Sequence, residues 1–360
     1  MWTLFLAPAL ACLWDGDTLA TELAGLPGLE QVVYGDFDRL PPDYYRHRLL
    51  RVEQQLSDGT ATPEDYDDGA VAADRLGLHQ LSIAWMETKR ALPNLDDDQR
   101  YRTEANLGTF YAHRWLAEGG DRRDTSDLHR AIGHLDAALE LNPDAHFGRE
   151  EVQRDLILWL RDLTPTRHPG TYLERSRRDD PRMGDDNTDG LHDVVVGLQG
   201  LIVLGAAWES VDVFYTLAVA LEGEGRNSAA RLVALRAQEL ALAGRPSLQP
   251  GLPRGEALAR QLEAGIGLHD GTVDRLAEDF REGRAMADRR SAARQRKLNA
   301  KLRQGQHPDT HPGFWDEALP QVRPVPELPS ERRGGGCAVA PTTERPLATW
   351  SRRRLGQVPQ

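Results

Sequence analysis

Oxygen-bearing side chains stand at alternate positions in one short stretch of this sequence. Asp185, Asn187 and Asp189 come directly before a glycine, and Asp193 stands where a ninth-position ligand would lie. Alternating oxygens that end in a glycine turn are the pattern that wraps a calcium ion. The place of the bidentate twelfth ligand, however, is taken by Val196. We therefore expect an exposed acidic loop that caps the following helix, with calcium binding as the alternative.

No other group of side chains has the spacing of a catalytic or metal centre. The eleven histidines are scattered, and His129 and His134 stand five apart, whereas two helical metal ligands need a spacing of four. The sequence contains no G-x-S-x-G, no phosphate-binding loop and no H-E-x-x-H. Two cysteines, Cys12 and Cys337, form neither a disulfide framework nor a zinc site. We predict a protein that is not an enzyme and uses no cofactor or metal.

The elements that must position any site are clearest between residues 100 and 143. Leu107, Gly108 and Tyr111 share one helix face, and the glycine lets a second helix approach closely. A second helix follows, in which small residues alternate with large ones that fill the groove between the helices: Ala131, Ile132, Leu135, Ala138 and Leu139. Pro143 ends the unit, because proline cannot continue a helix.

This residue order resembles the tetratricopeptide repeat (TPR), a helix pair of 34 residues. Two weaker units follow the same order, at Pro63–Arg90 and at Asp212–Leu240. One departure is an insertion of 11 residues between the central helices, which we expect as an exposed loop at Gly119–Asp127. The resemblance implies an all-α fold, an α-solenoid of antiparallel helix pairs in which neighbouring units bury each other's apolar faces.

The rest of the chain divides around these units by composition. We predict these segments: 1–11, apolar and signal-like; 12–62, N-terminal capping helices; 63–163, the repeats 63–96 and 100–143 with a following helix; 164–190, a loop rich in Asp and Arg; 191–244, a buried helix and the third repeat; 253–304, C-terminal helices; and 319–360, a disordered tail.

The N-terminal residues bear on where the protein is located. Residues 1–11 are apolar and end in Ala9-Leu10-Ala11, which is similar to the end of a secretory signal, although no basic residue precedes them. Cys12–Leu19 then resembles the C-L-W-D-x-D-T-L start of a group of bacterial exported repeat proteins of unassigned function. We expect export to the periplasm or the medium, with a cytoplasmic protein as the alternative. We also expect Cys12–Leu19 to be a cap whose aspartates face water.

The net charge of the protein limits which classes of partner it can bind. The net charge of −12 disfavours general binding to nucleic acid or to anionic membranes. Residues 281–303 are nevertheless basic, with nine Arg or Lys against Glu282 and Asp288. Without interleaved aromatic residues, we expect a solvated terminal helix rather than a nucleic-acid site. We predict no transmembrane helix, since the apolar run at Leu191–Ala207 is too short to cross a bilayer comfortably.

In the repeat family, set positions on the first helix of each pair face the ligand. The resemblance places these residues of the present sequence there: Asp67, Asp74, Arg75, Arg102, Thr109, His113, Asp212, Tyr215 and Glu222. Acidic residues outnumber arginines at these positions, which favours a protein or peptide partner of basic character. We predict a non-catalytic scaffold for protein–protein interaction. The alternative is an accessory region of an enzyme or metal-dependent protein that uses the loop 164–190.

Overall fold

The computed structural model describes residues 13–18, 25–142, 148–162, 168–169, 173, 188–265, 273–311, 314 and 325–328. Within these residues all regular structure is helical, which confirms the predicted all-α class. Several predicted features lie outside the described residues: the segment 1–11, both cysteines, the side chains of the calcium-like run, most of the loop 164–190 and most of the tail 319–360.

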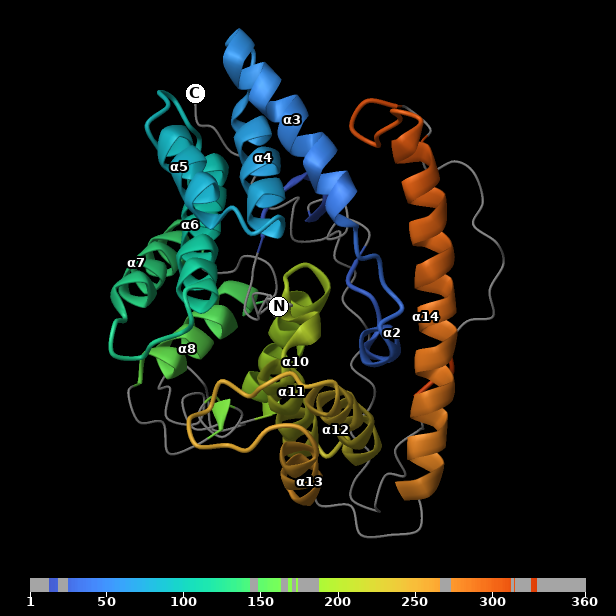
Figure 1. The fold of residues 1–360 in the computed structure, drawn as a ribbon. Coiled ribbons are helices and arrows are strands. Elements are labelled where there is room, and N and C mark those ends of the chain that lie inside the picture. The colour runs from blue at the N-terminus through green and yellow to red at the C-terminus, as the bar shows by residue number, and fades with distance from the viewer. Residues whose placement is uncertain are drawn as a thin grey trace, which may run out of the picture. The chain divides into compact units, whose positions relative to one another are not determined.

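Helix α2 at Leu29–Tyr34 and helix α3 at Pro42–Asp58 precede the first predicted repeat (Figure 1). Pro42 is the first residue of α3, where a missing N–H costs no hydrogen bond. Gly59 ends α3 in the left-handed conformation, with φ +67°, which glycine adopts without strain.

The first predicted repeat comprises α4 at Pro63–Arg75 and α5 at His79–Arg90. Thr62 and Asp65 form a reciprocal cap at the start of α4, in which each side chain accepts a hydrogen bond from the other residue's backbone N–H. Inside α4, a Cβ at Gly69 would stand 2.3 Å from the ring of Trp85 and 2.7 Å from Val52. A glycine is therefore required where α4 touches α3 and α5.

The central unit comprises α6 at Asp97–Ala117 and α7 at Ser126–Leu141. A Cβ on Gly108 would lie 2.7 Å from Cγ of Leu135 and 3.1 Å from the carbonyl oxygen of Ala131. Ala131 and Ala138 on α7 are fully buried. The small residues thus stand where the two helices meet, as the sequence predicted, because a larger side chain would hold the helix axes apart.

Residues 118–125 link α6 to α7, close to the predicted loop at Gly119–Asp127, and most of them are exposed as expected. The Arg122 guanidinium is half-buried and donates to the carbonyls of Trp159 and Leu160 at distances of 2.9 and 2.8 Å. Part of the loop is therefore an anchor for the end of a later helix, since the last carbonyls of a helix need donors.

The second half of the chain continues the series of helices. These are α8 at Arg149–Arg161, α10 at Thr188–Val203, the 3-10 turn η2 at Ala207–Glu209, α11 at Val211–Gly223, α12 at Asn227–Leu242, α13 at Glu256–Ala264 and α14 at Val273–Arg303. Helices that follow one another in the chain form most of the packed pairs: α3 with α4, α5 with α6, α7 with α8, α10 with α11 and α12 with α13. No helix among the described residues is both long and apolar enough to cross a membrane.

Helix α14 contains the predicted basic stretch, and it packs on other elements more than we expected. It contacts α2, α3 and α12 (Figure 1) and buries Phe280 and Leu298. Arg284 is paired with Glu239 of α12 at 3.1 Å, and Arg294 with Asp38 at 2.8 Å. Much of the basic charge thus neutralises acidic residues of the same chain instead of facing water.

Candidate functional site

Residues 13–18 lie on the helices without being part of the helical series. Leu13 and Trp14 have no helical structure, whereas residues 16–18 are helical. Trp14 retains only 2% of its exposure and Asp15 only 8%. The expectation of a cap holds for the two apolar side chains, whereas Asp15 is buried and does not face water. We refer to residues 13–18 as the docked segment.

Asn106 of α6 binds the main chain of the docked segment. The Trp14 N–H donates to Asn106 Oδ1 at 2.8 Å, and Asn106 Nδ2 donates to the Trp14 carbonyl at 3.0 Å. The amide thereby pairs with both polar groups of one residue, as a neighbouring β-strand would. Because Asn106 is fully buried, water does not compete for these two bonds.

The Trp14 indole lies in a pocket formed by α6, α7 and α8. The ring of Tyr101 meets it edge-on at a centroid distance of 5.6 Å, and Ala105 and Ala138 complete a small apolar cluster. The guanidinium carbons of Arg102 and Arg149 stand 5.9 and 5.0 Å from the indole centroid. Such distances allow attraction between a cation and an aromatic face.

The Glu150 carboxylate also accepts a hydrogen bond from that indole. Trp14 Nε1 donates to Glu150 Oε1 at 3.4 Å, and Glu150 lies at the start of α8, fully buried beside Arg149. A tryptophan N–H that leaves water usually finds such an acceptor. The pocket therefore matches tryptophan in shape, in ring contacts and in its single donor.

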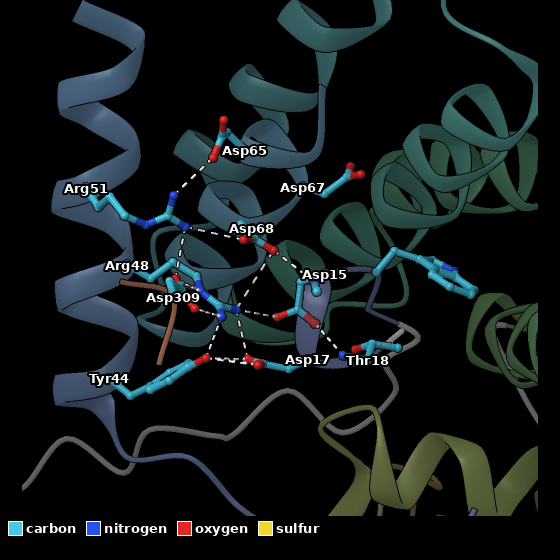
Figure 2. Close-up of polar contacts among 12 residues, drawn as sticks. Asp15, Asp17, Thr18, Tyr44, Arg48, Arg51, Asp65, Asp67, Asp68 and Asp309 are labelled. Carbon is cyan, nitrogen blue, oxygen red and sulfur yellow. Dashed lines mark hydrogen bonds and ion pairs between the residues drawn. The ribbon is translucent and has the colours of Figure 1, made fainter. Parts of the chain in front are cut away.

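The two aspartates of the docked segment meet Arg48 of α3 (Figure 2). Arg48 Nη1 is 3.1 Å from Asp15 and 2.8 Å from Asp17, and its Nη2 is 2.6 Å from Asp309. The Tyr44 hydroxyl donates to Asp17 at 2.8 Å. The segment is also hydrogen-bonded to α4: the Gly16 N–H donates to the Asp68 carboxylate at 2.8 Å.

Arg51, one turn after Arg48, extends the same cluster. It contacts Asp65, Asp68 and Asp309 at 3.0, 3.3 and 2.9 Å (Figure 2). Five carboxylates thus surround two guanidiniums, and full ionisation would leave three excess negative charges. This imbalance predicts that the cluster takes up a proton more readily than isolated aspartates do.

The acid strengths follow from burial and from this imbalance. Burial and the nearby Asp15 carboxylate raise the pKa of Asp17 to about 6. Burial also raises the pKa of Asp68, although Arg48 opposes it. For Arg48, burial alone would lower the pKa, but the carboxylates around it, Asp309 first, hold that pKa well above its ordinary value.

A cavity of about 620 Å³ adjoins the docked segment. Its lining includes Asp15, Asp17 and Thr18 from the segment, Tyr45 and Arg75 from α3 and α4, and Leu204 and Trp208 after α10. Arg75 donates to the carbonyls of Leu204 and Gly205 at 3.1 and 3.0 Å. Among the described residues, the docked segment therefore borders this cavity through Asp15, Asp17 and Thr18.

Asp67 and Asp74, which the sequence placed on the ligand-facing side, are buried and paired within the protein. Asp67 accepts two hydrogen bonds of 2.7 Å from the fully buried Lys89. Burial raises the pKa of Asp67 to about 7, although Lys89 pulls it down. Asp74 accepts from Nδ1 of both His79 and His113 at 2.8 Å.

Asp74, His79 and His113 form the group that could hold a metal ion among the described residues. Their candidate ligand atoms lie within 4.8 Å of one another, and all three residues are buried. Burial alone would raise the pKa of Asp74, but the two histidines hold it well below its ordinary value. Through these two hydrogen bonds the carboxylate braces α4, α5 and α6 together. Sequence spacing did not reveal this group, because His113 is 39 residues from Asp74.

The remaining predicted partner residues divide by exposure. Thr109 and Asp212 are buried; Thr109 accepts from Gln153 at 3.0 Å, and Asp212 accepts from Ser247 and from the N–H of Leu248. Four others are half-buried: Arg75, Arg102, Tyr215 and Glu222. Within this set, Arg102 approaches the docked segment: its guanidinium carbon lies 5.9 Å from the centroid of the Trp14 ring. Partner binding by these residues stays a prediction, but the buried acids no longer support a basic partner.

Asn106, Trp14 and Arg48 were not among the predicted site residues. Asn106 offered a signal, since it is a polar residue directly before Leu107 and Gly108 in the clearest predicted repeat. A search of protein-family models, of curated proteins and of solved structures finds no match to this chain.

Proposed function

We propose that this protein is a non-catalytic scaffold that binds an extended segment of a protein partner, on an α-solenoid of TPR-like helix pairs. The pairs are α4 with α5, α6 with α7 and α11 with α12, and each packs closely. Small residues at the α6–α7 contact and packing between chain neighbours support the repeat interpretation.

One observation carries the proposal: these helices already hold a segment from a distant part of the chain, whose first two residues are non-helical. The Asn106 amide pairs with the main chain of Trp14, side chains from α6, α7 and α8 enclose its indole, and Arg48 binds the carboxylates that follow. Main-chain bonds that give affinity, combined with side-chain pockets that give specificity, are the usual means by which proteins bind peptides.

Export is a further part of the proposal, and it rests on the signal-like residues 1–11. Fractionation of the source cells, followed by mass spectrometry of the mature N-terminus, tests it. Protein that is found outside the cytoplasm and has lost residues 1–11 would support export, whereas cytoplasmic protein that retains Met1 would end it.

Cross-linking in the source organism tests the scaffold. The wild-type chain and the Asn106→Ala variant are captured in parallel, with Arg260→Ala as a matched control, because Arg260 is exposed on α13 and far in sequence from the site. We expect a protein whose cross-links map to α3, α4, α6 and α8 and whose yield falls in the Asn106 variant alone. Equal capture by all three chains, or no captured protein, would contradict the proposal.

A further inference from the structure

Asp74 is a buried acid whose partners among the described residues include no arginine or lysine. We propose that Asp74, His79 and His113 together bind one divalent transition-metal ion, for which zinc is the best-suited candidate, and that this ion joins α4, α5 and α6. The inference does not depend on the scaffold function. It departs from the expectation of no metal, which rested on the scattered spacing of the histidines in the sequence.

The need for a cation is clearest from a comparison with Asp67, two turns earlier on α4. The two residues, Asp67 and Asp74, keep only 2% and 1% of their surface exposed. The Asp67 carboxylate lies 2.7 Å from the Lys89 ammonium, whereas Asp74 meets two imidazoles. A buried carboxylate is costly unless a positive charge balances it. Either a proton on one imidazole or a metal ion held by all three side chains supplies that charge.

The arginines that neighbour these side chains in the sequence are directed elsewhere. Arg75, next to Asp74, donates to two backbone carbonyls after α10 at 3.1 and 3.0 Å. Arg114, next to His113, is paired with Asp127 at 2.6 Å. Neither guanidinium therefore balances Asp74, and neither would repel a metal ion at close range.

The donor atoms converge on one point and are of the kind that zinc prefers. Oxygens of Asp74 lie 2.8 Å from Nδ1 of each histidine, and the two ring centroids are 6.0 Å apart. Ligands at about 2.0–2.2 Å from a tetrahedral zinc ion stand about 3.3–3.6 Å from one another, so shifts of under about 1 Å would admit the ion. Two imidazole nitrogens with one carboxylate oxygen suit zinc and its neighbours better than calcium or magnesium. On binding, the proton on each Nδ1 moves to Nε2, and each imidazole stays neutral.

The local structure holds these ligands in place without a metal. A tight turn joins α4 to α5 and brings the ring of His79, the first residue of α5, to Asp74. In that turn the Gly77 N–H donates to the Asp74 carbonyl at 2.8 Å, and Gly77 has φ +78°, which glycine adopts without strain. His113 is supplied by α6 and is fully buried, whereas His79 keeps 8% of its surface exposed and gives an ion a route from solvent. Ligands fixed on rigid helices favour tight binding.

Zinc titration of the full chain tests the inference. The protein is first stripped with a chelator, and zinc binding is then measured by competition with a chromophoric chelator. Wild type is compared with Asp74→Asn and with His129→Gln, a control for surface histidines, because His129 is exposed on α7. We expect one zinc ion per chain in wild type and in the control. Even the loss of a residue that supports a metal ligand costs about 10–100-fold, so Asp74→Asn should weaken binding at least about 100-fold. Millimolar calcium should not compete.

X-ray absorption of the wild-type zinc complex keeps the test decisive if Asp74→Asn does not fold. We expect two imidazole nitrogens and a carboxylate oxygen at about 2.0–2.2 Å from the metal. A wild-type chain that binds no zinc at micromolar concentration would overturn the inference and leave a proton on one histidine as the balancing charge. Equal binding by wild type and Asp74→Asn, or a spectrum without imidazole ligands, would place the metal elsewhere and would also overturn it.

Discussion

Replacing Asn106 by alanine isolates the contact on which the site depends. The substitution removes the acceptor for the Trp14 N–H and the donor to the Trp14 carbonyl, which lie 2.8 and 3.0 Å from the amide. Both groups belong to a residue with 2% of its surface exposed, so water cannot replace the lost partners while the segment stays in place.

The cost follows from those two groups. A buried polar group without a partner costs about 1–3 kcal/mol, so two such groups cost about 2–6 kcal/mol. The loss cannot exceed the free energy of docking, because the segment would then undock and expose the indole. A tryptophan buries roughly 150–250 Å², which corresponds to about 4–6 kcal/mol at about 25 cal/mol per Å². We therefore expect docking to weaken by about 2–4 kcal/mol, which lies within the cost of the two unpaired groups and does not exceed the limit set by undocking.

Native-state hydrogen exchange of residues 13–18 measures this quantity directly. Asn227→Ala is the control: Asn227 is exposed at the start of α12, and its replacement should change stability by less than about 0.5 kcal/mol. Asn106→Asp should weaken docking more than alanine does, since a carboxylate cannot donate to the Trp14 carbonyl and would face Asp67. Unchanged protection of residues 13–18 in both Asn106 variants would refute the reasoning.

Three further predictions concern packing, buried charge and pH. Gly108→Val should lower the free energy of unfolding by about 1–3 kcal/mol, because the larger side chain overpacks against Leu135. Gly133→Ala should raise the free energy of unfolding by about 0.5–1 kcal/mol, because a Cβ at this position of α7 meets open space. Urea denaturation measures both changes. Lys89→Met should lower the free energy of unfolding by about 3–5 kcal/mol, because it leaves the Asp67 carboxylate buried without its cation. The double variant that also carries Asp67→Leu should recover most of this stability in calorimetry. No recovery would contradict the pairing of Lys89 with Asp67. Because burial and Asp15 raise the pKa of Asp17 to about 6, the docked segment binds a proton more readily than the free segment does. Docking should therefore strengthen as the pH falls from 7 through 6 towards 4, which exchange rates corrected for intrinsic chemistry would show; weaker docking at pH 5 than at pH 7 would contradict this sign.

Local patterns in the sequence were sufficient for much of the fold. Gly108 and Ala131 predicted where α6 and α7 touch, because close approach of two helices leaves a mark within a few residues. The bounds of the six-residue helix α2 were not predicted within the capping helices 12–62, since it is shorter than two turns and gives little periodicity. The break between α6 and α7 was predicted to within two residues at each end, because Gly119 and Gly120 interrupt the helical pattern.

The site was harder to predict because its contacts join distant parts of the chain. Trp14 and Asn106 are 92 residues apart, and Arg48 and Asp309 are 261 apart. Position within a repeat predicted that Asp67 would lie on the inner face of the helices. It did not show that the face is covered by the chain itself, nor that Lys89 would neutralise that carboxylate.

The most direct test of the account is a nuclear Overhauser measurement on the full chain with labelled tryptophan and tyrosine. The indole of Trp14 lies edge-on to Tyr101 with ring centroids 5.6 Å apart, so cross-peaks between the two rings are expected. The peaks should disappear in Trp14→Phe and persist when labelled and unlabelled chains are mixed. A well-dispersed spectrum without these cross-peaks would contradict docking of residues 13–18 on the helices.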